Sequence, residues 1–402
     1  MRLGAVGLLS TALVLTACGG GGEGDADGET FTIGAVLPLS GPLAGGGDEM
    51  RRGYELAVEK AGGEIDGTKI ELKFGDAPSA EAAVTESERL ITREGADALM
   101  GTYMTALSQA GSEVAARNGL PWIETNALTD ALTERGLENY FRTGPTASQF
   151  ATSSIDFIAD ALAPKLGGGP LKVFLENEDG PYGQAIAAIQ EDTLEELGYE
   201  VEVGSHAATA VDVTDAVLAA KRFDPDVWVI TGYESDTSLL TKTAQQQSFD
   251  PSATVFVAAG DTQLVLEAVG QDALTDKFAV TYSSESSNGE WAPENGFYDE
   301  YRDKYGEDPV GAVASTAYAG MTSFLTILGD ADGTDLDSIT KAARAIDIEV
   351  GGIPGGWGLQ FDEAGENERV RLVVVQWRDN GTNVAVWPLD AAADGESLAM
   401  GE

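Results

Sequence analysis

The chain has 402 residues with 24 basic and 67 acidic side chains, which gives a formal net charge of −43. This balance excludes general nucleic-acid binding and adhesion to anionic membranes through a polybasic face, because both need clustered Lys and Arg. The single Cys excludes an internal disulfide and an iron–sulfur cluster, and the single His leaves few possible ligands for a metal centre. We therefore expect neither a metal nor a cofactor.

The first residues have the pattern of a secretory signal. Arg2 precedes an apolar run from Leu3 to Val14, which is shorter than a typical transmembrane helix. The tetrapeptide Leu15-Thr16-Ala17-Cys18 resembles the bacterial lipobox, in which the Cys is lipidated and becomes the mature N-terminus. We expect a signal peptide over residues 1–17, a flexible acidic tether over 18–29, and anchoring at Cys18 to the extracytoplasmic face of the membrane, with no other membrane contact.

From residue 30 the sequence alternates between strand and helix patterns. Phe31 to Leu37 is a nearly continuous apolar run, which is typical of a strand buried on both faces. Further strands of a first series are predicted at 70–74, 98–100 and 121–123. A second series, starting near Thr143, has predicted strands at 172–175, 200–203, 227–231, 254–257 and 278–282. Helical spacing separates these strands, so the pattern predicts two α/β lobes with mostly parallel sheets.

Signals of catalysis and metal binding are weak. His206 follows an edge-like strand, and no Ser-containing nucleophile elbow accompanies it, so we expect a surface residue rather than a general base. The acidic turn at 330–335 fails as a calcium loop because its Gly is misplaced and Lys341 stands at the twelfth position. Two exported α/β lobes without catalytic groups indicate a binding protein rather than an enzyme.

Several motifs over residues 30–388 match one family in order and spacing. The first is residues 36–44, VLPLSGPLA, at the end of the first strand. Others are Gly53-Tyr54-Glu55-Leu56-Ala57, Gly75-Asp76-Ala77, Phe141-Arg142-Thr143, Pro181-Tyr182-Gly183 and the closing GWGLQFD at 356–362. Together they resemble the leucine/isoleucine/valine-type solute-binding proteins of ABC importers.

The resemblance implies the periplasmic-binding-protein type I fold, with two Rossmann-like lobes joined by three crossovers near Pro145, Ser283 and Leu372. It places the N-terminal lobe at 30–145 plus 283–372 and the C-terminal lobe at 146–282 plus 373–390, with a tail at 391–402. It also implies a small-molecule ligand, most simply an amino acid, and ABC permease subunits as partners. A ligand sensor without transport is the alternative role, and a secreted hydrolase is a weaker one.

Candidate ligand-binding residues follow predicted strands, because open α/β sheets bind ligands beyond the carboxyl ends of their strands. In the family the loops at Thr105 and at Asn126-Ala127 hold the ligand carboxylate. Tyr182, Tyr233 and Asp261 come from the second lobe, and the family often has an acid near Asp261 that pairs with the ligand ammonium.

Three departures from the family leave the ligand class open, and one is that Pro78 and Met104 stand where some members have disulfide cysteines. Gly45-Gly46-Gly47 stands where an aromatic residue usually forms one wall of the pocket, so we expect that wall to be missing. Asp261 is one methylene shorter than the usual Glu. A branched-chain amino acid, another amino acid, an aliphatic amide and an aromatic carboxylate therefore remain as ligand classes.

Overall fold

The computed structural model describes residues 29–292 and 296–400. Its N-terminal sheet has six strands, in the order β2 (Glu64–Ile65), β3 (Thr68–Asp76), β1 (Thr30–Leu37), β4 (Ala98–Gly101), β5 (Trp122–Glu124) and β6 (Tyr140–Arg142). All neighbouring strands are parallel except β2 and β3. Strand β1 is buried along all but its first residue, as its apolar run predicts for a central parallel strand.

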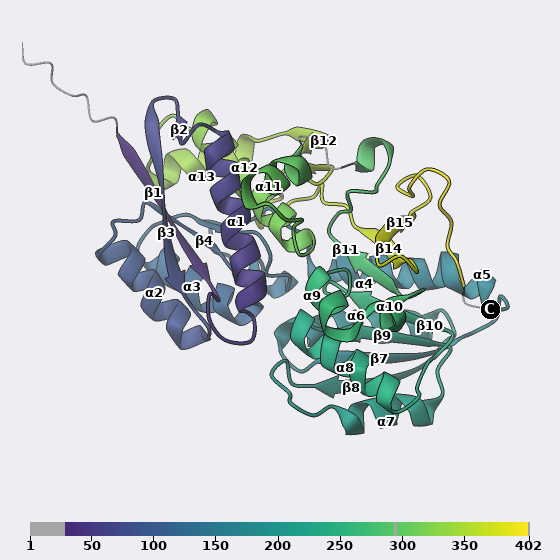
Figure 1. Cartoon of the computed structure of the whole chain (residues 1–402). Helices are drawn as coiled ribbons and strands as arrows, with labels where there is room; N and C mark the ends of the chain where they lie inside the picture. The colour runs from purple at the N-terminus through teal and green to yellow at the C-terminus, as the bar shows by residue number, and fades with distance from the viewer. Residues whose placement is uncertain (1–28, 293–295, 401–402) are drawn as a thin grey trace, which may run out of the picture.

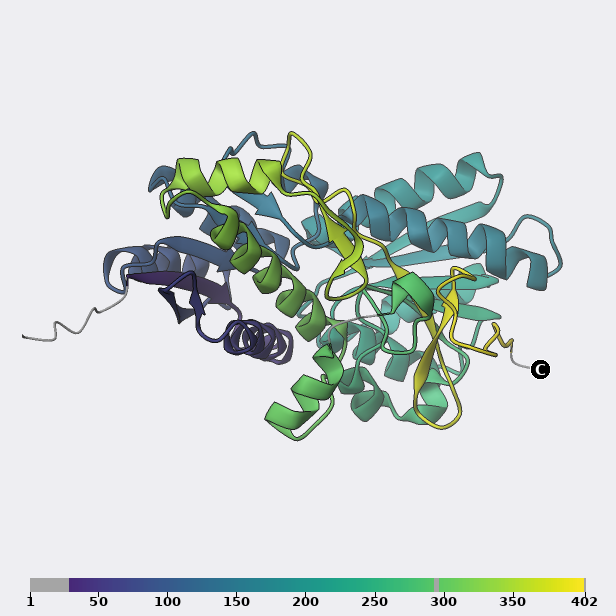
Figure 2. The same cartoon turned by 90° about the horizontal axis from the view of Figure 1, so that it is seen from above.

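Helices cover both faces of this sheet (Figures 1 and 2). The helices α1 (Ala44–Lys60) and α12 (Ala312–Asp330) pack together over one face, and α2 (Ala80–Thr92) and α3 (Thr105–Arg117) cover the other. Helix α12 has the length and hydropathy of a membrane span, but 78% of its most apolar 18-residue window is buried inside the structure. It is therefore the central packing helix of this lobe.

The C-terminal sheet has seven strands. Their order is β15 (Asn383–Trp387), β14 (Val373–Trp377), β11 (Phe278–Thr281), β10 (Ala253–Val257), β9 (Val227–Thr231), β7 (Lys172–Glu178) and β8 (Glu200–His206). The strands from β11 to β8 are parallel, and β14 and β15 add an antiparallel edge. Along β9, Val227 and Val229 join one hydrophobic cluster while Trp228 and Ile230 join another, so helices cover both faces here too.

The helices of this lobe form two layers. One layer contains α4 (Ala147–Asp156), the π-helical turn η2 (Phe157–Leu162), α5 (Ala163–Lys165) and α6 (Pro181–Glu196). The other contains α7 (Thr214–Phe223), α8 (Glu234–Gln246), α9 (Gln263–Val269) and α10 (Gln271–Leu274). The predicted two-lobed α/β architecture is confirmed by these two layered sheets.

The chain crosses between the lobes in passages that follow β6, β11 and β13 (Trp357–Leu359). After β6 it enters α4. After β11 it returns through η3 (Gly289–Trp291), α11 (Phe297–Tyr305), α12, α13 (Leu336–Ala345) and the hairpin of β12 (Ile348–Ile353) with β13. It then reaches β14 in the C-terminal sheet. Because neither lobe is one continuous segment, the lobes share a hinge made of several chain passages.

Candidate functional site

A cavity lies between the lobes, where loops that follow the strands of both sheets meet. Tyr103, Thr105, Asn126 and Leu128 line it from the N-terminal lobe. Tyr182, Gly232, Tyr233, Ala258 and Tyr282 line it from the other side. Its volume in this conformation is about 10 Å³, room for a single water molecule. A larger ligand therefore needs the lobes to separate or the lining side chains to move.

The residues predicted to bind ligand are partly brought together here. Thr105, Asn126, Tyr182 and Tyr233 all line the cavity. Ala127 is buried beside them, 1% exposed, but does not line the cavity. Asp261 lies in a neighbouring groove.

The walls of the cavity are largely aromatic. The ring of Tyr233 packs between those of Tyr103 and Tyr182, at centroid distances of 5.5 and 5.4 Å, so one aromatic row crosses from lobe to lobe. The Tyr182 hydroxyl donates to the Val257 carbonyl at 3.1 Å. Burial raises the pKa of each of these phenols well above its ordinary value, which keeps the row neutral.

Gly46 makes room for Tyr103, while Gly45 and Gly47 face Leu264 and Pro38. A Cβ atom at Gly46 would lie 2.7 Å from the Tyr103 ring, and one at Gly47 would lie 2.1 Å from the Pro38 carbonyl oxygen. These residues therefore permit the first turn of α1 to pack against Tyr103. Tyr103, from the loop after β4, lines the cavity beside this turn.

Glu234, at the start of α8, is an acid that sequence reasoning missed. Its carboxylate crosses to the other lobe, where the Tyr103 hydroxyl donates to Oε1 at 2.8 Å and to Oε2 at 2.7 Å. The residue is 8% exposed, and burial raises the pKa of its carboxyl group to about 7. Its position directly after Tyr233, on a strand-end loop, is the signal that could have found it.

A second buried acid, Glu124 at the end of β5, occupies the loop predicted to bind a carboxylate. Its Oε1 accepts hydrogen bonds from the backbone N–H groups of Thr125, Asn126 and Ala127 at 3.0–3.1 Å, and also from that of Thr102. The burial of Glu124 raises the pKa of its carboxyl group to about 7. The N–H groups of this loop are thus already used by the protein's own carboxylate.

The Asn126 side chain is left with a free donor. Its Oδ1 accepts from the Thr125 hydroxyl at 2.8 Å, while its Nδ2 is buried without a hydrogen-bond partner among the described residues. A buried amide donor usually finds an acceptor. The Asn126 amide is therefore the group of this loop best placed to meet a ligand.

Asp261 has partners of its own in the neighbouring groove, whose volume is about 510 Å³. Its carboxylate accepts from the Thr281 hydroxyl at 2.7 Å and from the backbone N–H of Ala312, the first residue of α12. Two residues on, the Gln263 N–H donates to the Val310 carbonyl at 2.5 Å. This segment thus joins the C-terminal lobe to the N-terminus of α12.

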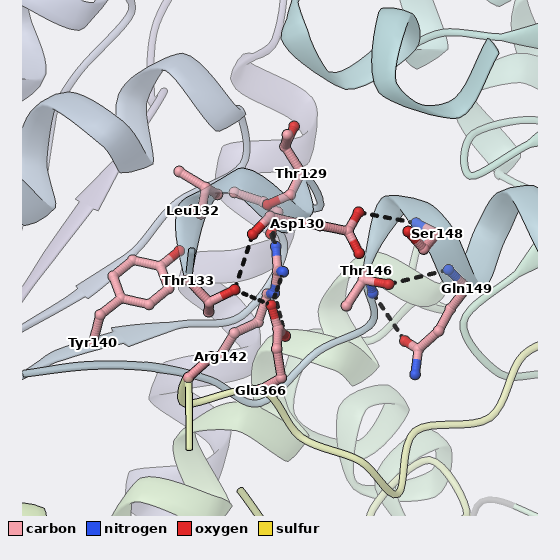
Figure 3. A network of polar contacts seen from close by, with 12 residues as sticks. Thr129, Asp130, Leu132, Thr133, Tyr140, Arg142, Thr146, Ser148, Gln149 and Glu366 are labelled. Carbon is pink, nitrogen blue, oxygen red and sulfur yellow. Dashed lines mark hydrogen bonds and ion pairs between the residues drawn. The ribbon is translucent and has the colours of Figure 1, made fainter. Parts of the chain in front are cut away.

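Behind the cavity, an ion pair between a buried Arg and a partly buried Glu stabilises the loop that carries Asn126 and Leu128 (Figure 3). Arg142 is fully buried and pairs with Glu366, with Nε to Oε2 at 2.9 Å. Its Nη1 donates to the carbonyls of Ala127 and Thr129 at 3.0 and 2.9 Å. The two carbonyls flank Leu128, so Arg142 fixes the cavity wall from behind.

The same loop also contacts the other lobe. Asp130 Oδ2 accepts from the Ser148 N–H at 3.1 Å, and the Leu128 carbonyl accepts from the Ala147 N–H at 2.7 Å. Both donors lie in the first turn of α4. The first crossover and the cavity wall are therefore one connected structure.

His206 is not the surface residue that we expected. It is 7% exposed, and its Nδ1 and Nε2 lie 2.8 Å from Glu176 and 2.9 Å from Asp236. Burial alone lowers its pKa, but the hydrogen bonds to Asp236 and Glu176 raise it to about 9. Asp236 also accepts from the Tyr233 N–H at 2.8 Å, so this buried network supports the cavity.

Comparisons with known proteins agree with this architecture. Residues 30–382 match the family model of the periplasmic binding proteins. The Leu/Ile/Val-binding protein homolog 7 of Brucella suis is 36% identical over 371 residues, which cover 90% of this chain and 92% of the relative.

Solved structures share the fold. The branched-chain amino acid substrate-binding protein of Streptococcus pneumoniae, in complex with isoleucine, has a TM-score of 0.77 at 21% identity, covering 93% of this chain and all of that one. A solute-binding protein of Rhodopseudomonas palustris, in complex with 3,4-dihydroxybenzoic acid, has a TM-score of 0.75 at 21% identity, covering 90% and 95%. The chain belongs to the periplasmic binding protein family, in its branched-chain amino acid type, whose members are extracytoplasmic substrate-binding proteins.

Proposed function

We propose that this protein captures a small ligand between its lobes and delivers it to an ABC importer. The observation that supports this most is the cavity between the sheets, which both lobes line with polar and aromatic side chains. A ligand that contacts both lobes favours the closed conformation, because it binds that conformation more tightly than the open one. The permease would then recognise the closed, loaded form.

An amino acid is the ligand class that we propose for the site. The Thr105 hydroxyl and the Asn126 amide are neutral groups that can receive its carboxylate from the N-terminal lobe. The C-terminal lobe supplies acids that can pair with its ammonium, Asp261 by the family resemblance and Glu234 by its place beside the cavity. Tyr182 and Tyr233 would pack against the ligand side chain.

A ligand screen followed by thermal unfolding tests this proposal. We expect at least one amino acid, in a panel that also holds aliphatic amides and aromatic acids, to raise the melting temperature. Saturation at 100 times Kd stabilises the fold by about 2.7 kcal/mol.

The Asn126→Ala variant should weaken the binding of that ligand by about 1–3 kcal/mol, because the buried amide donor of Asn126 is lost. Asn380→Ala, in an exposed turn, is the control and should bind as the wild type does. A panel in which no compound shifts the wild type would contradict the proposal.

We also propose that Cys18 carries a lipid anchor, although it lies outside the described residues. The support is the lipobox-like Leu15-Thr16-Ala17-Cys18 after a short apolar run. The variant Cys18→Ser should appear in the medium or as uncleaved precursor instead of in the membrane fraction. Mass spectrometry that finds an unmodified mature N-terminus in the wild type would disprove the anchor.

A further inference from the structure

A further groove lies at the hinge of the molecule. This hinge groove is formed by one side of α4, by Trp291 of η3, by residues 370–372 and by the end of β15 at Trp387. Its volume is about 370 Å³, which is in the size range of small-molecule sites. The described residues that line it are all different from those that line the cavity, so it is a separate site.

All three chain passages between the lobes contribute to the hinge groove. Ser148 and Thr152 belong to α4, which the chain enters after the first passage. Trp291 lies in the second passage, and residues 370–372 lie in the third. Closure of two lobes changes the backbone of the passages that join them. A molecule bound in the hinge groove therefore contacts segments that move against one another.

The apolar walls of the hinge groove suit a flat ring. The indoles of Trp291 and Trp387 line it, and the Trp291 N–H donates to Asp390 Oδ2 at 3.0 Å, which orients that indole. Aromatic rings pack on such walls in offset or edge-to-face arrangements. Helix α4 adds polar groups to the groove, which are the side chains of Ser148, Gln149, Thr152 and Ser153.

The charge of the hinge groove differs from that of the whole protein. Arg371 lines it, and the described lining residues include neither Asp nor Glu, although the chain has 67 acidic residues. The Arg371 guanidinium carbon lies 4.1 Å from the centre of the Trp291 ring, and Nη2 donates to the Gly356 carbonyl at 3.0 Å. A planar guanidinium held in a fixed orientation favours a carboxylate as its partner.

The hinge groove is connected to the cavity through the first turn of α4. The Ser148 N–H donates to Asp130 Oδ2 at 3.1 Å, and the Ala147 N–H donates to the Leu128 carbonyl at 2.7 Å. Leu128 lines the cavity, while Ser148 lines the hinge groove. A displacement of this turn is therefore transmitted to the cavity wall.

We propose that the hinge groove binds a small aromatic carboxylate, and that this binding changes the equilibrium between the open and closed lobes. The ring packs against the indoles of Trp291 and Trp387, and the carboxylate pairs with Arg371. The groove is a second site, which adds an effector to the ligand capture proposed above. An effector that binds one lobe arrangement more tightly than the other changes the affinity of the cavity for its own ligand.

Benzoate and benzamide are the probes of the first test, because they share a ring and differ in charge. Calorimetry on the mature wild type should show that benzoate binds, and that benzamide binds at least about 10-fold more weakly, since the neutral amide forms no ion pair with Arg371. Arg371→Met should bring the two affinities close together. A melting curve of this variant without a probe checks that it is folded.

The variant Thr152→Trp locates the bound benzoate. Thr152 is exposed on α4 and lines the hinge groove, so an indole at this position fills the groove and leaves the cavity residues unchanged. The affinity for benzoate should fall at least about 10-fold. Thr85→Trp, at an exposed position of α2, is the matched control and should bind benzoate as the wild type does. Asn126→Ala, in the cavity, should also leave benzoate binding unchanged.

A second measurement tests the effect on the lobes. Small-angle X-ray scattering of the wild type should give a different radius of gyration with saturating benzoate than without it. The affinity for the tightest cavity ligand of the screen should change at least about 5-fold when benzoate is added. Both effects should be absent in Thr152→Trp and present in Thr85→Trp.

The outcomes separate this inference from the proposed function. Benzoate binding that is lost in Asn126→Ala and kept in Thr152→Trp would place benzoate in the cavity, which overturns the inference and supports a solute-binding function. A wild type that does not bind benzoate, or that binds it without a change in scattering or in ligand affinity, would also overturn the inference. A compound of the screen counts as a cavity ligand only if its effect persists in Thr152→Trp, and a screen without such a compound would contradict the proposed function.

Discussion

Replacing Arg142 with methionine is expected to lower the free energy of unfolding by about 3–5 kcal/mol. The substitution leaves the Glu366 carboxylate without its cation and the carbonyls of Ala127 and Thr129 without their donor. Urea unfolding followed by circular dichroism measures the change. Ligand affinity should fall as well, because the loop with Asn126 and Leu128 loses its support.

Two further variants make this prediction specific. Changing both partners, Arg142→Met with Glu366→Met, should recover part of the lost stability, since no unpaired buried charge remains. Lys341→Ala removes an exposed ion pair with Asp332 and should leave the unfolding midpoint unchanged. A loss below about 1 kcal/mol in Arg142→Met would show that the buried pair does not stabilise the hinge.

The second large effect is a loss of stability between pH 6.5 and 9. His206 has a folded-state pKa of about 9 and an unfolded value near 6.5, so it keeps its proton in the fold where the unfolded chain has lost it. The stabilisation is complete below pH 6.5 and disappears as the pH rises through 9. The shift corresponds to roughly 3 kcal/mol.

Other groups titrate in a different range. Burial raises the carboxyl pKa of Glu124 and Glu234 to about 7. The protonated carboxyl groups therefore favour the fold at low pH, and this part of the stability is lost as the pH rises from about 4.5 to 7. Melting temperatures measured from pH 7.5 to 9 therefore report mainly on His206, whereas above pH 9 the buried tyrosines, whose pKa is raised, add a further loss. His206→Gln should have a nearly flat profile there, and a wild-type profile equally flat would contradict a charged His206.

Much of the fold could be predicted because it depends on local patterns. Continuous apolar runs such as Val227–Thr231 mark central parallel strands, and helical spacing between them indicates the covering layers. The pairing of Arg142 with Glu366 could not be found in this way. The two residues are 224 positions apart, and only the folded crossover brings β6 beside the segment after β13.

The location of four candidate residues could be predicted from their position along a strand. Thr105, Asn126, Tyr182 and Tyr233 follow strands, and the ends of parallel strands face the cleft. Glu234 was missed because an acid in the first turn of a helix is ordinary, and the chain has 67 acidic residues. His206 was misplaced because the two carboxylates that bury it come from other segments, Glu176 on β7 and Asp236 on α8.

The central claim is that a ligand with an amino group binds between the lobes. The crystal structure of the protein with the tightest ligand of the screen tests it most directly. We expect the ligand in the cavity between Asn126 and Tyr182, with its ammonium nitrogen at a charge-assisted hydrogen-bond distance, about 2.7–2.9 Å, from the carboxylate of Asp261 or Glu234. A ligand found away from the space between the lobes, or one without an amino group, would contradict the account.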